Sequence, residues 1–217
     1  VSAANSLVGS TANDKIGDFT DPLPNGNYVV TSRTWDNGSA INAGASTWRN
    51  GIVDLVGPIT ATNSLIGSTT NDYVGIFKKI NNNFYVVFSD GWNNGSVAQV
   101  GAVTVCDVNT GKFGVVGPTN SLVGVSANDH IGSSLYYYSE NLYPNNDFAL
   151  FSYEFDNGAL VDAGAITPIS VSDIPVGPVN GCNSILGYVA NQGNSRFPDY
   201  NPTHNYFISS FFNQAIC

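Results

Sequence analysis

The stretch that decides the fold is Asn5-Ser-Leu-Val-Gly-Ser-Thr-Ala-Asn-Asp-Lys-Ile-Gly17, because it returns further along the chain. The same pattern starts again at Asn63 and Asn120, and a shorter version starts at Asn183. Starts that recur roughly every 60 residues indicate a tandem repeat, in which most positions serve the scaffold. We therefore expect function to lie mainly in positions that differ between the copies.

Asn-Gly pairs at residues 25–26, 37–38 and 50–51 separate apolar runs within the first copy. Both residues tolerate the positive φ angles of tight hairpin turns, so each pair can reverse one short strand into the next. No segment shows a sustained helical period. Each copy therefore predicts four antiparallel strands, which in the first copy cover residues 17–23, 27–35, 43–48 and 58–66.

Four-stranded units of this length favour an all-β repeat fold, above all a β-propeller with about four blades. The alternatives are a β-solenoid and a tandem row of small sheets. One domain, 1–217, would contain units 11–66, 67–123 and 124–186 and an atypical closing segment, 187–217. The last blade would be split between the termini, with strand 1–10 completing it. No segment supplies its third strand, so that blade is either short or completed by a neighbouring subunit.

The composition describes a globular, acidic chain. Its 217 residues are 42% hydrophobic, with a mean hydropathy of −0.01, which is enough for a substantial core. Seven Lys and Arg stand against 16 Asp and Glu, giving a net charge of −9. This charge opposes sequence-independent binding to nucleic acid and to anionic lipid. No apolar run reaches the roughly 18 residues of a membrane span, so membrane insertion is not expected.

Several features predict secretion. Methionine is absent, even at position 1, which is typical of a chain whose signal peptide has been removed. Cys182 and Cys217 bracket the closing segment and predict a disulfide, with two free thiols as the alternative. Cys106 would be an unpaired, buried cysteine. Asn37 and Asn94 begin Asn-Gly-Ser triplets, which are either glycosylation sites or turn chemistry.

The repeats resemble those of secreted bacterial proteins of the filamentous-haemagglutinin and adhesin type. The likeness rests on the Asn-Ser-Leu-Val-Gly pattern, on Asn25-Gly-Asn-Tyr-Val-Val30 and on Trp35-Asp-Asn-Gly38. It implies an extracellular surface repeat. A looser likeness is to the FG-GAP blades of integrin-type propellers, which often hold calcium in an acidic loop. The matching turn at residues 23–27 carries amides instead of carboxylates, so we expect no metal and no cofactor.

The sequence contains few residues in patterns that are typical of catalytic sites. Asp14, Asp72 and Asp129 recur once per copy, and we interpret them as turn residues that accept backbone N–H groups. His130 and His204 are the only histidines, and His130 occupies a variable position of the repeat. The sequence has no zinc-ligand spacing, nucleophile elbow or phosphate loop. We therefore predict that the protein is not an enzyme. Glycoside hydrolysis would need two carboxylates that meet only in the fold.

The largest difference between copies is an insertion before the second strand of the third copy, at residues 135–144. Insertions on a rigid repeat are favoured places for binding. Aromatic rings can stack on sugars, although these tyrosines could equally pack a longer strand. The predicted ligand-binding residues are Tyr136, Tyr137, Tyr138, Tyr143, Trp35 and Trp92.

These observations lead to one prediction and two alternatives. We predict a secreted, non-catalytic binding module, adhesin-like or lectin-like, that recognises a glycan or a cell-surface protein. The first alternative is a structural subunit of an extracellular filament, sheath or layer that self-associates by strand exchange. The second alternative is a glycan-active enzyme.

Overall fold

The computed structural model describes residues 1–53, 56–132, 148–170, 173–194, 199–201 and 206–208. Over these residues the chain is all-β, with several small sheets and one short 3-10 turn, η1 (Gln192–Asn194). No helix in this part of the chain is long and apolar enough to cross a membrane. The predicted all-β repeat fold is confirmed.

The sheets repeat one strand order. The first five-stranded sheet runs β10 (Gly114–Val115), β6 (Leu65–Ile66), β4 (Ala45–Arg49), β3 (Tyr28–Ser32), β2 (Phe19–Pro22). The second runs β14 (Gly177–Pro178), β11 (Leu122–Val123), β9 (Ala102–Asp107), β8 (Phe84–Ser89), β7 (Ile76–Lys79). The third has β12 (Phe148–Ser152), β13 (Ala165–Ile169) and β15 (Ile185–Leu186). Two-stranded sheets pair β1 (Leu7–Val8) with β5 (Gly57–Pro58), and β16 (Asp199–Asn201) with β17 (Tyr206–Ile208).

Asn-Gly turns connect the long strands as the sequence predicts. Between β2 and β3, Gly26 has a φ of 85° and its N–H donates to the Leu23 carbonyl at 3.1 Å. Between β3 and β4, Gly38 has a φ of 62° in a turn closed by a bridge between Asn37 and Ala40. Glycine adopts this left-handed region without strain. The hairpin prediction is therefore confirmed at both turns, although only the glycine of each pair has a positive φ. At the third predicted pair, residues 50–51, neither residue has one.

The fourth predicted strand, residues 58–66, is instead two short strands, β5 and β6. β6 pairs antiparallel with β4 inside its own sheet, whereas β5 pairs in parallel with β1. The same parallel pairing joins β10 to β6 and β14 to β11. Each unit therefore sends a short strand back to the sheet before it, and these bridges tie the units together.

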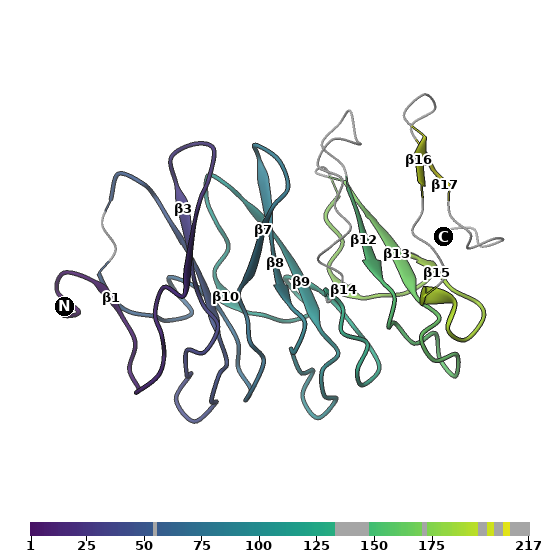
Figure 1. Cartoon of the computed structure of the whole chain (residues 1–217), viewed down its shortest axis with the longest axis horizontal. Coiled ribbons are helices and arrows are strands. Elements are labelled where there is room, and N and C mark those ends of the chain that lie inside the picture. Colours follow the sequence, from purple (N-terminus) through teal and green to yellow (C-terminus); the bar gives the residue numbers. More distant parts are fainter. Residues whose placement is uncertain (54–55, 133–147, 171–172, 195–198, 202–205, 209–217) are drawn as a thin grey trace.

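The described sheets stand side by side in an open row (Figure 1). β1 pairs with β5 at one end of the row, while β16 and β17 lie at the other end. The predicted strand at residues 1–10 therefore does not join the closing segment, and no sheet among the described residues closes into a ring. The predicted four-bladed propeller is not confirmed, and the alternative of tandem small sheets describes the observed row.

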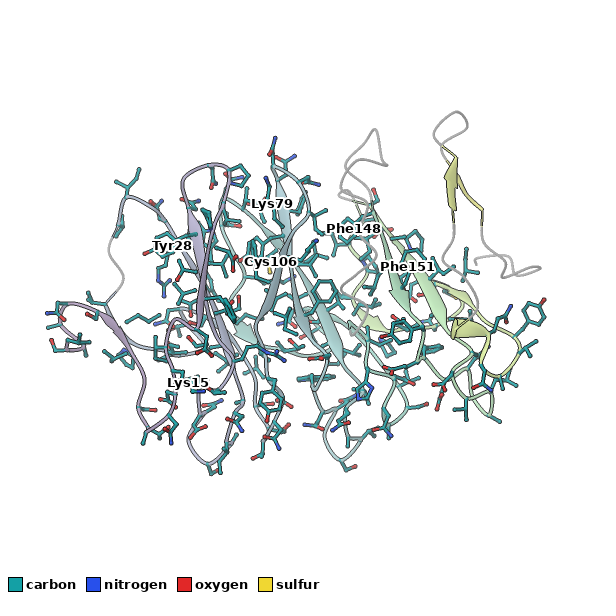
Figure 2. All side chains as sticks on the ribbon, viewed as in Figure 1. Lys15, Tyr28, Lys79, Cys106, Phe148 and Phe151 are labelled. Atoms are coloured by element: carbon teal, nitrogen blue, oxygen red, sulfur yellow. The ribbon has the colours of Figure 1, made fainter. Side chains whose placement is uncertain are left out.

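The core lies between neighbouring sheets. One cluster fills the space between the first and second units and includes Val29, Tyr85, Val87 and Cys106. A second lies between the second and third units and includes Phe88 and Ile131. Figure 2 shows Tyr28, Cys106 and Phe148 on three successive sheets. Because one small sheet cannot bury its own face, each unit depends on its neighbours for stability.

Candidate functional site

The recurring aspartates belong to the scaffold. Asp72 is fully buried, and its carboxylate accepts N–H groups of Ser68 and Thr69, at 2.9 and 2.8 Å, and of Asn93, at 3.0 Å. Asp14 and Asp129 accept the equivalent bonds in their own turns. The structure therefore supports the interpretation of these aspartates as turn residues that saturate backbone donors.

The same turn has different electrostatics in two copies. Burial raises the pKa of Asp14, but hydrogen bonds from Thr11, Asp36 and Ser10 outweigh this effect and leave the pKa below its ordinary value. Burial also raises the pKa of Asp129, and here it outweighs the hydrogen bonds, so the pKa stays above its ordinary value. Desolvation disfavours the charged form of a carboxyl group, and donated hydrogen bonds favour it.

A groove lies between the first and second units. It has a volume of about 320 Å³, and its walls come from β2, β3 and the start of β7. Small-molecule sites in proteins have volumes of about 300–1,000 Å³, so one small ligand fits. The residues that line the groove are Phe19, Asp21, Thr31, Arg33, Gly75, Ile76 and Phe77.

The groove exists because Thr31 is small. Thr31 pairs with Ser46, whereas the equivalent pairs are Phe88 with Val103 and Phe151 with Ile166. Phe88 is fully buried and fills the equivalent space between the second and third units. The first copy has two small polar residues where the others have large apolar ones, and the unfilled volume is the groove.

The register places the polar groups along the groove. Phe19 lies opposite Thr31, and Asp21 lies opposite Val29, so all four side chains share one face of the sheet. Arg33 follows two residues after Thr31. The order along this face is therefore a carboxylate, an aromatic ring beside a hydroxyl, and a guanidinium.

Thr31 supplies a polar group without a partner. The side chain is 2% exposed, and among the described residues its Oγ1 has no hydrogen-bond partner. Most buried hydroxyls in proteins are hydrogen-bonded, so an unpaired hydroxyl in the wall of the groove is an unusual feature of the first copy. Phe19, which is 66% exposed, offers an open ring face beside it.

Of the two charged side chains that line the groove, Arg33 has an ion-pair partner. The Arg33 guanidinium lies 3.3 Å from the Asp90 carboxylate of the second unit and 5.7 Å from the centre of the Tyr73 ring. Burial raises the pKa of Asp21 above its ordinary value. With its single cation paired, the groove suits a neutral ligand that offers hydroxyl groups and an apolar face.

The two tryptophans that the sequence analysis predicted as ligand-binding residues lie away from the groove. Trp35 and Trp92 are each 4% exposed and pack in the core, so neither ring presents a face to a ligand, and we correct that assignment. The sequence identified them only as aromatic residues that recur, and recurrence is what an inter-sheet core also requires. Tyr136, Tyr137, Tyr138 and Tyr143 lie outside the described residues. Neither tryptophan is among the residues that line the groove.

The structure describes two of the three cysteines and both Asn-Gly-Ser sites. Cys106 is a buried thiol, as predicted, and burial raises its pKa to about 12. Cys182 is exposed, but Cys217 lies outside the described residues, so the structure gives the predicted disulfide no support. Asn94 is exposed, whereas the Asn37 side-chain amide donates to the Gly67 carbonyl at 3.0 Å. Glycosylation at either stays a prediction.

His130 has two polar neighbours. Its Nδ1 lies 3.0 Å from a Glu154 carboxylate oxygen, and its Nε2 lies 3.0 Å from the Gln99 side-chain oxygen. It links the second and third units and is not near the groove residues in any contact of the described chain. His204 lies outside the described residues, and in the part of the chain that is described no group of acidic, histidine or cysteine side chains could hold a metal ion.

These features define a tandem-repeat β protein with a groove at the boundary between its first two units. The chain belongs to the family described as a repeat of unknown function (DUF5650), which matches residues 1–18, 22–76, 79–133 and 143–195. No curated protein matches the chain, and neither does any solved structure. Each of the four matched segments contains one copy of the pattern that starts at Asn5, Asn63, Asn120 or Asn183, which confirms the four-fold repetition. Nothing in these comparisons bears on the resemblance to adhesins or to FG-GAP blades.

Proposed function

We propose that the protein is a secreted, non-catalytic binding module of the adhesin or lectin type, and that the groove between its first two units binds a neutral glycan. One observation carries the proposal: an open aromatic ring, Phe19, lies beside the unpaired buried hydroxyl of Thr31. A sugar ring can stack its apolar face on an aromatic side chain while its hydroxyl groups form hydrogen bonds.

The other groove residues support a neutral ligand. Asp21 can accept hydrogen bonds from sugar hydroxyls, and Arg33 is already paired with Asp90. The net charge of −9 disfavours a polyanionic ligand. Asp21 is the only carboxylate among the lining residues of this groove, whereas glycoside hydrolysis in most families uses two, so binding is favoured over catalysis.

The test replaces Thr31 by the residue of the other copies. Thr31→Phe should fill the groove without disturbing the fold, because Phe88 occupies the equivalent position beside Gly132 as Thr31 does beside Gly75. Binding partners would be found on an array of neutral glycans, and their affinities measured by calorimetry. We expect Thr31→Phe to weaken binding at least about tenfold, which corresponds to roughly 1.4 kcal/mol.

Thr20→Phe is the matched control. Thr20 is exposed on the neighbouring strand β2, its side chain points to the opposite face of the sheet from Thr31, and Phe77 holds the equivalent position in the second unit. It adds the same atoms outside the groove and should leave affinity unchanged. The proposal fails if folded wild-type protein binds no neutral glycan, or if Thr31→Phe binds as tightly as Thr20→Phe.

A second candidate is structural assembly, which the open row of sheets favours. A row with unclosed ends can extend by adding further units. Electron microscopy and light-scattering mass of the purified protein without ligand would decide it. Ordered fibres or layers would support assembly, and a monomer at all concentrations would count against it.

A further inference from the structure

A second unusual residue lies on the outer face of the first sheet. Arg49 ends β4, and in the second and third units the equivalent positions are held by Cys106 and Ile169. Those two residues are 2% exposed and pack toward the preceding unit. Arg49 is 7% exposed, so the first unit buries a cation where the others bury an apolar side chain.

Only one nitrogen of the Arg49 guanidinium has partners. Nη1 donates to the backbone carbonyls of Trp48 and, at 3.4 Å, of Asn63. Nε and Nη2 are shielded from water, and across the described residues neither has a hydrogen-bond partner. A buried polar group in a native structure is normally paired, so these two donors need an explanation.

The two unpaired nitrogens lie on one edge of the guanidinium. Nε–H and Nη2–H point in parallel along that edge, which is the geometry that binds both oxygens of a carboxylate. Burial lowers the pKa of Arg49 to about 10, so the group is still a cation at neutral pH. Among the described residues, Arg49 forms no ion pair. This edge of the cationic guanidinium therefore carries two parallel donors that have no hydrogen-bond partner among the described residues.

Tyr28 completes the surroundings of this edge. It pairs with Arg49 across β3 and β4, so both side chains lie on the same face, and it is half-buried. Figure 2 labels Tyr28 on the first sheet of the row. Trp48, the neighbour of Arg49, points the other way, since its Nε1–H donates to the Val108 carbonyl of the second unit at 2.9 Å. Arg49 and Tyr28 thus belong to the face of the first sheet that is turned away from the second unit, where Ala45 packs in a cluster with Leu7 of β1 and Ile59.

We propose that the Nε–Nη2 edge of Arg49 binds a carboxylate group supplied by a ligand on this outer face. A carboxylate carries one negative charge, which one guanidinium neutralises. A doubly charged phosphate would leave an uncompensated buried charge in a protein that is already acidic. The carboxylate comes either from a small acid or from an acidic side chain of a second copy of the chain. This site is separate from the groove, because Thr31 and Arg49 face opposite sides of the first sheet.

Thermal unfolding tests the site. Wild-type protein and Arg49→Ile would be compared at pH 7 in acetate and in chloride at equal ionic strength. We expect acetate to raise the unfolding temperature of the wild type by about 2–4 °C relative to chloride, because a ligand of the folded state stabilises it. Arg49→Ile should fold, since Ile169 holds the equivalent position, and should show no difference between the two salts.

Light-scattering mass identifies the source of the carboxylate. If a second copy supplies it, wild-type mass rises with protein concentration, acetate reverses the rise, and Arg49→Ile stays monomeric. If a small acid supplies it, the wild type stays monomeric and the acetate effect alone remains. Both results support the site. Arg49→Lys, which keeps the charge without the two-donor edge, supplies the comparison if Arg49→Ile does not fold. The proposal is overturned if wild type and variant respond equally to acetate and have equal masses.

Discussion

The boundary between the first and second units differs from the boundary between the second and third in what fills it. Both have an aspartate turn, and both bury a cluster of apolar side chains. At the second boundary Phe88 is fully buried, whereas at the first the equivalent Thr31 leaves a groove with an unpaired hydroxyl. One scaffold therefore carries either a filled core or a candidate binding site, depending on the side chains of one cross-strand pair.

The largest loss of stability is expected when the side chain that fills the second boundary is truncated. Phe88→Thr gives that position the residue of the first copy and should lower the free energy of unfolding by about 3–5 kcal/mol, because truncating a buried Phe leaves a cavity. Urea denaturation followed by fluorescence would measure it. Ile41→Thr, at a residue that is 55% exposed, is the control and should change stability little. A loss no larger than that of the control would mean that Phe88 does not fill the boundary.

The aspartate turns, unlike Phe88, are shared by both boundaries, so their removal should lower stability at each. Asp72→Ala leaves the partly buried N–H groups of Ser68, Thr69 and Asn93 without their acceptor and should cost about 1–3 kcal/mol. Asp129→Ala should cost somewhat less, since Asp72 also accepts a bond from the Asn93 side chain at 2.9 Å. Chemical denaturation of both variants decides this. Equal stability of Asp72→Ala and wild type would contradict the scaffold role.

The smallest effect is expected at the ion pair of the first boundary. The side chains of Arg33 and Asp90 are 34% and 37% exposed, so solvent screens their attraction. Arg33→Ala should lower stability by less than about 1 kcal/mol, and added salt should shrink the difference. A double-mutant cycle with Asp90→Ala would isolate the pair. A coupling energy above about 1 kcal/mol that does not change with salt would show that solvent does not screen the pair and would contradict this prediction.

Much of the fold could be predicted because the signals are local. Turn residues such as Asn25-Gly26 and apolar alternation in Tyr28–Ser32 act over a few residues, and the hairpins follow from them. The parallel bridges could not be predicted in this way. β5 and β1 are two-residue strands that are far apart in sequence, and no local pattern distinguishes them from the ends of a longer antiparallel strand.

The predicted site was only partly informative. The expectation that differences between copies matter led to the third-copy tyrosines, which lie outside the described residues, and not to Thr31. The signal for Thr31 was present, because aligning the copies sets it against Phe88 and Phe151. A loss of bulk at one position is harder to notice than an insertion, although it changes the packing more directly.

The repeat, its hairpins and the acidic, all-β character of the chain can be read from the residues alone, because they depend on turn chemistry and on composition. The packing of the units settles whether the described sheets close or remain in an open row, which face of each sheet is covered, and which buried donors of the described residues lack partners. Those properties depend on the contacts between units. Thr31 and Arg49 acquire their importance from what the neighbouring sheets leave unfilled or unpaired.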